Sequence, residues 1–274
     1  MATESYRPKY VGEADEETKE VLIPRHSGRK NEEMRPMHIQ TGVIHCASGS
    51  GLVTLGKTHV IGAVYGPSPQ RGAYKDHGVL KIDVSMAGFA THRSLDLESG
   101  SRVAKKMGRI HSASIQAALD GLILLEKYPK AEINIQLKIL EDDGSALSAL
   151  ITAASLALAD AGIEMRDVIP AVSVCMVPQS GGETDRSSYL LDPDGVEERS
   201  LPAESGVLDV ALAHRHGTLA FLQSSGPLTP RQMDQMLQLA MDAARSVGEE
   251  MRRCLEDGHR AKKRKAEHML SDVN

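Results

Sequence analysis

The spacing of hydrophobic residues predicts a series of β-strands in the first half of the chain. Residues 51–55 and 58–65 are β-rich and alternate, and the Gly56-Lys57 pair between them is typical of a hairpin turn. Residues 79–86 alternate with period two and predict a further strand. Residues 133–140 alternate most regularly, with Ile or Leu at every second position, so one face of this strand should be buried.

Helical periodicity marks three other segments. Apolar residues recur at broadly helical spacing over residues 101–127, which predicts a long helix that ends before Pro129. Residues 145–161 are rich in Ala and Leu on nearly all sides and are closed by Gly162, so we expect a helix buried between layers. The last helix should begin at Thr229-Pro230, where an N-cap residue is followed by Pro and by a Gln placed for a capping box.

The order of these elements predicts one α+β domain over residues 25–256, with helices packed on mixed sheets. Further strands are expected at residues 168–177, 207–213 and 218–223. Residues 1–24 are polar and acidic and are expected to form a flexible arm. Residues 257–274 form a polar and basic tail, whose Lys262-Lys-Arg-Lys265 run fits either a disordered terminus or a nuclear-import patch.

Composition excludes several classes of protein. No apolar run is long enough for a membrane span or a signal peptide, so no membrane partner is expected. Three scattered cysteines suggest neither a disulfide framework nor a zinc site, and a reducing compartment fits best. The formal charge is −5, there is no Trp and there are only two Phe residues, so any contact with RNA should be local and ionic.

Three stretches resemble the ribonuclease PH family of phosphorolytic exoribonucleases. The first is Arg25-His-Ser-Gly-Arg29 followed by Arg35-Pro36, which resembles the opening segment of the family. The second and most specific runs from Tyr128-Pro129 through the strand at 133–140 to residues 151–167, and it is similar to the core of ring subunits of the eukaryotic RNA exosome. The third is Leu190-Leu-Asp192 with Glu197-Glu198, at the place of the family's metal-binding acids.

The resemblance implies a ribonuclease PH-like domain, of the ribosomal protein S5 domain 2-like type. It also implies a hetero-hexameric ring of such subunits, with cap subunits as further partners and single-stranded RNA in a central channel. The pattern at Leu140-Glu-Asp-Asp-Gly-Ser-Ala-Leu147 and Leu190-Leu-Asp-Pro193 is most similar to the ring subunit called mRNA transport regulator three. A location in the nucleus, including the nucleolus, and in the cytoplasm is the corresponding expectation.

Carried over residue by residue, the resemblance implies a degenerate active site. Two positions that grip phosphate in active relatives are Ala146 and Leu147 here, and neither side chain can bind an anion. A further arginine position falls on Gln116. The paired acids fall on Asp192 and Glu198, although an Asp before a Pro is also typical of a turn at a strand end.

We therefore expect a non-catalytic structural and RNA-channel subunit that needs no cofactor and holds no metal. Without a bound phosphate the reaction loses its effective-concentration advantage. The alternative is an active phosphorolytic 3′-to-5′ exoribonuclease that uses Mg²⁺ and phosphate, which Asp192 and Glu198 would support. A third possibility is that the chain supplies only RNA-binding cations to a partner's active site.

A cluster of cations provides candidate RNA contacts, since the family uses this region to line its channel. Several of them fall at helical spacing on one face of the expected helix, although they would also suit a solvated helix end. The candidate RNA-binding residues are Arg93, Arg102, Lys105, Lys106 and Arg109.

Overall fold

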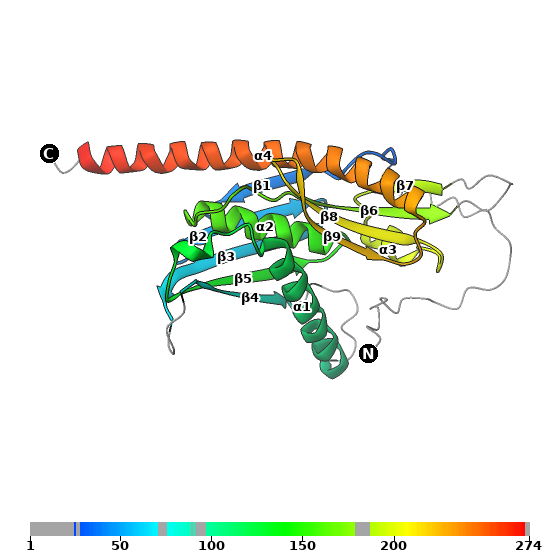
Figure 1. Ribbon diagram of the computed structural model, residues 1–274, viewed down its shortest axis with the longest axis horizontal. Coiled ribbons are helices and arrows are strands. Elements are labelled where there is room, and N and C mark those ends of the chain that lie inside the picture. Colours follow the sequence, from blue (N-terminus) through cyan, green and yellow to red (C-terminus); the bar gives the residue numbers. More distant parts are fainter. Residues whose placement is uncertain are drawn as a thin grey trace.

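Two β-sheets pack against one shared helix in the structure, a computed structural model (Figure 1). It describes residues 25, 28–70, 76–88, 90, 97–178 and 187–271, and the side chains of all of these except 97–103 and 265–271. The arm expected at residues 1–24 therefore lies outside the described residues. The order of strands and helices confirms the predicted α+β class.

The first sheet contains five strands in the order β1-β2-β3-β5-β4, and only the β4–β5 pair is parallel. The predicted hairpin is confirmed, with Leu55 opposite Thr58 and Gly56 in the left-handed conformation that this tight turn requires (φ 58°). The predicted apolar face of β5 is also confirmed, because Ile133, Ile135, Leu137 and Ile139 are at most 1% exposed. The strands are β1 (Met37–Thr41), β2 (Gly49–Leu55), β3 (Thr58–Pro69), β4 (Val79–Met86) and β5 (Ala131–Glu141).

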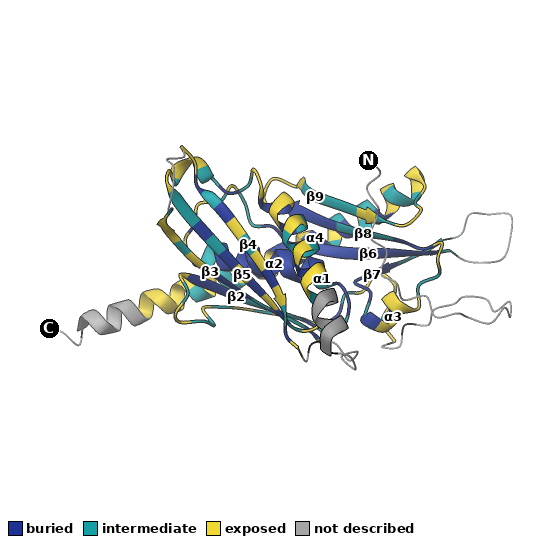
Figure 2. Cartoon of the chain, turned by 90° about the horizontal axis from the view of Figure 1, so that it is seen from below, coloured by how far each residue is buried: buried dark blue, intermediate teal, exposed yellow. Residues whose placement is uncertain are grey.

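Helix α2 (Ala146–Asp160) lies between the sheets and is buried on nearly all sides, as its composition predicts (Figure 2). It packs against β2 and β3 of the first sheet and against β6 and β8 of the second. The end of α2 can approach β2 closely because residue 49 is glycine: a Cβ at Gly49 would lie 2.1 Å from the backbone nitrogen of Ala161. The helix ends at Asp160, and Gly162, two residues later, has a φ of 70°, which confirms the predicted left-handed cap.

The second sheet is antiparallel, with the order β7-β6-β8-β9. One face joins the main core with α2 and α4, and a small cluster of Cys175, Val177 and Leu190 covers the other face. Burial raises the pKa of the Cys175 thiol, so this cysteine stays protonated and acts as an apolar core residue. The elements are β6 (Ala171–Pro178), β7 (Ser187–Leu191), the short helix α3 (Gly195–Arg199), β8 (Gly206–Ala213) and β9 (Thr218–Ser225).

Helix α1 (Leu97–Leu119) is shorter at its C-terminal end than the predicted helix over residues 101–127. Gly121 adopts a left-handed conformation (φ 78°) just after the helix and ends it there. A 3₁₀ helix, η1 (Leu125–Lys127), follows, and Ile123 forms an isolated bridge with Met165. The apolar residues after 119 thus pack as a turn and a 3₁₀ segment rather than as a continued α-helix.

Helix α4 (Pro230–Ser271) is far longer than its apolar stripe suggests. The predicted capping box is present, since the Gln232 side chain accepts from the Thr229 nitrogen at 2.9 Å and the Gln232 nitrogen donates to the Thr229 hydroxyl at 3.4 Å. The helix then continues to Ser271, so the boundary drawn at residue 256 falls inside it, and residues 272–274 lie outside the described residues. No helix among the described residues is long and apolar enough to cross a membrane.

Candidate functional site

Three arginines from the segment before β1 converge on the residues that follow β7. Arg25 donates to backbone oxygens of the same segment, and its Nε lies 3.5 Å from the Glu197 carboxylate. Arg29 lies 3.8 Å from both Asp192 and Glu197. Arg35 completes the group, and the three arginine side chains are 3%, 8% and 6% exposed. The segment with Arg25, Arg29 and Arg35 therefore packs against the residues after β7, and its arginines form ion pairs with carboxylates of the same protein.

Arg35 donates three hydrogen bonds to the Asp192 carboxylate. The carboxylate accepts from the Arg35 backbone nitrogen at 3.0 Å, from Nε at 2.9 Å and from Nη2 at 2.7 Å. Burial alone would lower the pKa of Arg35, but the hydrogen bond and charge of Asp192 outweigh it, so the pKa of Arg35 is raised. Asp192 is 1% exposed, and its φ of 51° turns the chain sharply after β7. The Asp192 carboxylate is thus committed to a structural ion pair.

The loop before α2 is joined to the loop after β7 by three hydrogen bonds. The Gly195 nitrogen donates to the Asp143 carbonyl at 2.8 Å. The Ser145 hydroxyl donates to the Pro193 carbonyl at 3.0 Å, and the Ser145 nitrogen donates to Glu198 Oε1 at 2.7 Å. These bonds close the approach to the start of α2 from the side of β7.

Arg35 and Thr58 fix the loop before α2 from the other side. Arg35 donates to the carbonyls of Asp143 and Gly144 at 2.6 and 3.2 Å. The Thr58 hydroxyl donates to the Gly144 carbonyl at 2.8 Å. Gly144 is in the left-handed region (φ 85°), and a Cβ there would lie 2.6 Å from the Pro193 carbonyl. The two loops can approach this closely only because this residue is glycine.

The N-terminus of α2 carries an internal carboxylate. Ser145 is the N-cap residue, but it is left-handed (φ 54°) and its own side chain caps no backbone N–H group of the helix. Glu198 accepts from the Ser145 nitrogen instead. A helix N-terminus is a favourable place for an anion, and here a carboxyl oxygen of the same protein occupies it. Ala146 and Leu147 follow, half-buried and 6% exposed, and their side chains have no donor.

Further acidic residues surround Glu198. Desolvation raises the pKa of the Glu198 carboxyl, and the charges of Asp142 and Asp209 raise it further. As a whole residue, Glu198 remains partly exposed to water. Desolvation also raises the pKa of Asp142, and it raises the pKa of Asp209 to about 6 although the Ser173 hydroxyl donates to that group. These three carboxyl groups therefore hold their protons more tightly than free carboxylic acids do.

Helix α3 explains which of the two adjacent glutamates is buried. Asp194 accepts from the nitrogens of Val196 and Glu197 at 2.9 and 2.8 Å, and Glu197 accepts from the Asp194 nitrogen at 2.9 Å. This complete capping box turns Glu197 inward, where it is 0% exposed and faces Arg25. Sequence reasoning singled out Glu198 and missed this role of Glu197, although the Asp-x-x-Glu spacing signals it.

Comparisons with known proteins agree with this architecture. The family described as "3' exoribonuclease family, domain 1" (RNase_PH) matches residues 33–164. An exosome complex component of Arabidopsis thaliana, RRP41-like, is 35% identical over 259 residues, which cover 93% of this chain and 94% of the relative. The chain belongs to the ribonuclease PH family. Rrp41 of Methanopyrus kandleri is a second relative of this family, 35% identical over 240 residues that cover 85% of this chain and 92% of the relative.

Solved structures of exosome proteins share the ribonuclease PH fold. Rice (Oryza sativa) Rrp46 superposes with a TM-score of 0.69 at 22% identity, covering 85% of this chain and 100% of Rrp46. A chain of the Archaeoglobus fulgidus exosome with RNA bound to the active site superposes with a TM-score of 0.64 at 23% identity, covering 82% of this chain and 92% of that chain. The predicted ribonuclease PH-like domain is thereby confirmed.

The structure places the remaining predicted residues of this ribonuclease PH-family chain on α1. Lys105, Lys106 and Arg109 are exposed there at helical spacing. Gln116 is also exposed, two turns further along the same face as Lys105 and Arg109, and its side chain makes no hydrogen bond within the described part of the chain. The side chain of Arg102 and the whole of Arg93 lie outside the described residues. Gln116 is thus placed beside the α1 cations.

The acids do not assemble into a ligand set for a metal ion. Across the residues that the structure describes, no three His, Cys, Asp or Glu side chains form a group that could hold one. Asp192 accepts three hydrogen bonds from Arg35, and Glu198 Oε1 accepts one from the start of α2. Both carboxylates of the expected pair therefore have protein partners.

Proposed function

We propose that this chain is a non-catalytic structural and RNA-channel subunit of an RNA exosome ring, supporting 3′-to-5′ RNA processing and degradation. Its relatives in Arabidopsis and Methanopyrus are named as exosome complex components, and both match it over nearly their full length. The shared fold with rice Rrp46 supports the same type of assembly. In this role the chain holds its neighbours and guides RNA, while other subunits carry out the chemistry.

The hydrogen bond from the Ser145 nitrogen to Glu198 is the observation that carries the proposal. Phosphorolysis needs an anion held next to the bond that is cleaved. At the place that the family resemblance assigns to phosphate, the chain has Ala146 and Leu147 and a carboxylate already bound at the helix N-terminus. An incoming phosphate would have to displace the Glu198 carboxyl group, and the side chains of Ala146 and Leu147 would offer it no hydrogen-bond donor.

The proposed assembly is a hetero-hexameric ring of ribonuclease PH-like subunits, joined by cap subunits, with single-stranded RNA in the channel. Within it we assign this chain to the mRNA transport regulator three type, on the sequence pattern around Ser145 and Asp192. The exposed cations Lys105, Lys106 and Arg109 on α1 are the proposed channel contacts. No cofactor is required for this role. We further propose that the protein works in the nucleus, including the nucleolus, and in the cytoplasm.

An assay of phosphorolysis tests the proposal. The full chain, alone and reconstituted with its ring partners, is incubated with 5′-labelled RNA, Mg²⁺ and inorganic phosphate, and nucleoside diphosphates are measured against a competent relative. The chain alone is expected to release none, and activity of the assembled ring is expected to be unchanged by the Glu198→Gln substitution. Diphosphate release by the chain alone that Glu198→Gln abolishes would overturn the proposal.

The alternative function is an active Mg²⁺-dependent phosphorolytic 3′-to-5′ exoribonuclease. It rests on the two acids, Asp192 and Glu198, that this chain retains. The three bonds between Arg35 and Asp192 count against it, because a metal ion would have to compete with a buried guanidinium. The remaining possibility, in which this chain lends cations to a partner's site, predicts that Lys105→Ala with Arg109→Ala slows the assembled ring.

A further inference from the structure

Helix α4 extends along one edge of the molecule and past the end of the first sheet (Figure 1). Its buried stripe of Met236, Ala240, Ala244, Val247 and Met251 is at most 4% exposed and belongs to the core. Beyond Met251 no described residue of the helix is buried. Packing on the second sheet therefore accounts for the first half of α4 and does not account for the rest.

Specific contacts nevertheless hold α4 on the body as far as residue 262. The Cys254 thiol donates to the Ile39 carbonyl of β1 at 3.5 Å, and Gly258 lets the helix pass so close that a Cβ there would lie 2.7 Å from the Thr41 hydroxyl. Lys262 then forms an ion pair with Asp160. The helix is positioned by these contacts up to the point where its charge changes sign.

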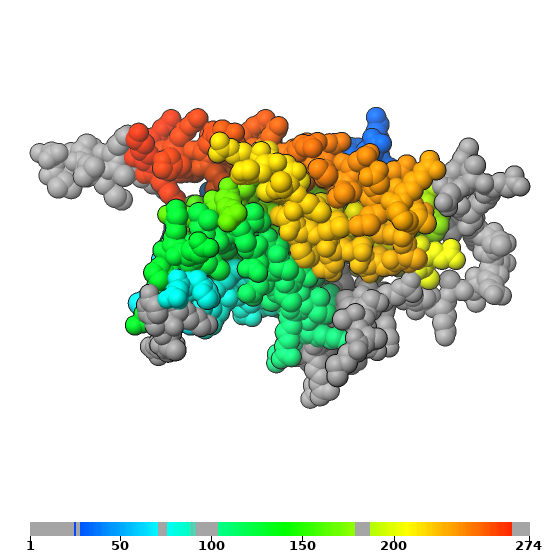
Figure 3. All heavy atoms as spheres, in the orientation of Figure 1, coloured from blue at the N-terminus to red at the C-terminus, as the bar shows by residue number. Residues whose placement is uncertain are grey.

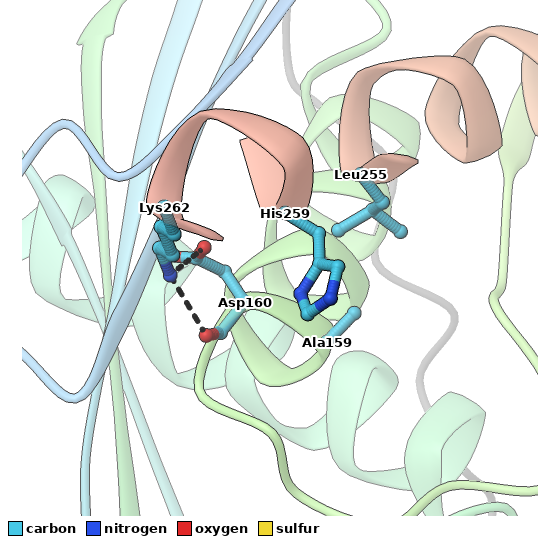
Figure 4. A pocket seen from close by; sticks show the side chains of 5 residues that line it. All are labelled: Ala159, Asp160, Leu255, His259 and Lys262. Carbon is cyan, nitrogen blue, oxygen red and sulfur yellow. Dashed lines mark hydrogen bonds and ion pairs between the residues drawn. The ribbon is translucent and has the colours of Figure 1, made fainter. Parts of the chain in front are cut away.

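The ion pair of Lys262 is itself held in place at the C-terminal end of α2 (Figure 4). Lys262 Nζ lies 2.6 Å from Asp160 Oδ1 and 3.3 Å from the Asp160 carbonyl, and Oδ2 accepts from the Ser50 nitrogen at 3.0 Å. The Asp160 side chain is 7% exposed and that of Lys262 is 55% exposed, so a buried carboxylate holds a cation that reaches it from the surface. A pocket of 240 Å³, lined in part by Leu255 and His259, lies beside it.

The charge pattern along α4 changes abruptly at Gly258. Residues 249–257 contain four acids and two arginines, whereas residues 258–271 contain five Lys or Arg residues and one acid, Glu267. The arginines at 252, 253 and 260 are paired with acids of the same helix. Lys263 and Arg264 are exposed, and neither forms a hydrogen bond or ion pair within the part of the chain that the structure describes.

Stabilisation of the helix end does not explain these cations. A cation interacts with the helix dipole only within about the last turn. Helix α4 ends at Ser271, so Lys263 and Arg264 lie about two turns before the end. Successive residues are about 100° apart around a helix, so Lys262 points toward Asp160 while Lys263 and Arg264 point in other directions, into solvent.

We infer that the exposed part of α4 at residues 260–264 is a second binding site, which takes the phosphate backbone of single-stranded RNA. The inference rests on the proposed role in RNA handling. A polyanion suits this surface because Lys263 and Arg264 are adjacent and exposed, have no protein partner among the described residues, and lie on a helix that the contacts of Cys254 and Lys262 hold in place. This part of α4, red in Figure 3, lies at one edge of the molecule. The last aromatic residue of the chain is Phe221, so the contact is ionic and independent of base sequence.

This site is separate from the degenerate one. Helix α2 touches Glu198 at its first residues and Lys262 at its last residue, and its 15 residues span about 22 Å. RNA on α4 therefore contacts the protein at the opposite end of α2 from the family's phosphate position. Loss of one site leaves the other intact, so the two can be tested independently.

The test is the salt dependence of RNA binding by the full chain. Affinity for a fluorescent, unstructured RNA is measured by anisotropy between 50 and 200 mM salt, for the natural protein and for Lys263→Ala with Arg264→Ala. Each phosphate contact contributes about 0.7 to the slope of log affinity against log salt, so the double variant should lower the slope by about 1.4. The loss of affinity caused by the double substitution should therefore be about sevenfold larger at 50 mM salt than at 200 mM salt.

Two controls make the outcome decisive. Lys57→Ala with Lys138→Ala removes the same charge from exposed positions on the first sheet and should leave the slope unchanged. Alanine favours helix, so circular dichroism at 222 nm should show no loss of helix in the α4 variant. An unchanged slope in that variant, an equal effect of the two double variants, or competition by polyglutamate as strong as that by RNA would each overturn the inference. These outcomes leave the phosphorolysis assay unaffected.

Discussion

The ion pair between Arg35 and Asp192 should be the most sensitive point of the fold. Both side chains are buried, at 6% and 1% exposure, and Arg35 also donates to two carbonyls of the loop before α2. Removal of one partner leaves an uncompensated charge in a low-dielectric environment, which costs about 3–5 kcal/mol in buried pairs. We therefore expect Arg35→Ala and Asp192→Ala each to lower the free energy of unfolding by about 3–5 kcal/mol.

Thermal and urea unfolding of the full chain, followed by circular dichroism, measure this effect. For a domain of this size, 1 kcal/mol corresponds to about 2–4 °C in Tm, so each substitution should lower Tm by about 6–20 °C. The double variant should be less destabilised than the sum of the two, with a coupling of about 1–3 kcal/mol, because the second removal no longer strands a charge.

A matched control is provided by the exposed pair of Arg245 and Asp242, whose side chains are 53% and 74% exposed. Arg245→Ala should change stability by less than about 0.5 kcal/mol. If Arg35→Ala cost no more than Arg245→Ala, or if the Arg35 and Asp192 substitutions were strictly additive, the reasoning that this buried pair holds the two loops together would be refuted.

Three other predictions concern a titrating acid, a close helix contact and a cap. Asp209 has a raised pKa of about 6, so the folded state holds its proton more tightly than the unfolded state does, and its contribution to stability should fall as pH rises from about 4 to 6. Asp209→Asn should therefore make the fall in the free energy of unfolding over this pH range less steep in urea titrations, and an unchanged slope would contradict the reasoning. Gly49→Ala should destabilise the fold by about 1–3 kcal/mol through its clash with the end of α2, whereas Gly88→Ala, with open space around it, should be neutral in the same melts. Asp194→Ala should cost about 1 kcal/mol by removing the capping box of α3, and an unchanged Tm would contradict that.

Local patterns predicted those elements whose burial follows from their own residues. The strand expected at residues 79–86 is β4 with the same bounds, and the apolar face expected on residues 133–140 is the buried face of β5. The helix expected at 145–161 is α2, because a segment that is apolar on all sides can be stable only inside the protein. Short elements were missed: β1 and β7 have five residues each, too few for a clear alternation.

The errors at helix ends have particular causes. Helical spacing continues past Leu119, but Gly121 and the backbone contacts of Ile123 and Leu124 end α1 before the apolar residues do. In the opposite direction, α4 runs to Ser271 although its apolar stripe ends near Met251. Contacts of Gly258 and Lys262 with residues far away in the sequence support that extension. Such contacts cannot be predicted from the spacing of apolar residues along the helix.

The amino-acid sequence by itself determined the α+β class, the buried face of β5, the central position of α2 and the loss of donors at Ala146 and Leu147. Each of these depends on residue type and on spacing over a few positions. Only the tertiary structure decided that Arg35 forms an ion pair with Asp192 and that Glu198 accepts a hydrogen bond at the start of α2. Those pairs join residues that are 157 and 53 positions apart, and the choice between Glu197 and Glu198 depends on which way a five-residue helix turns. Ion pairs between distant residues depend on how whole elements pack, and for that reason local sequence patterns do not predict them.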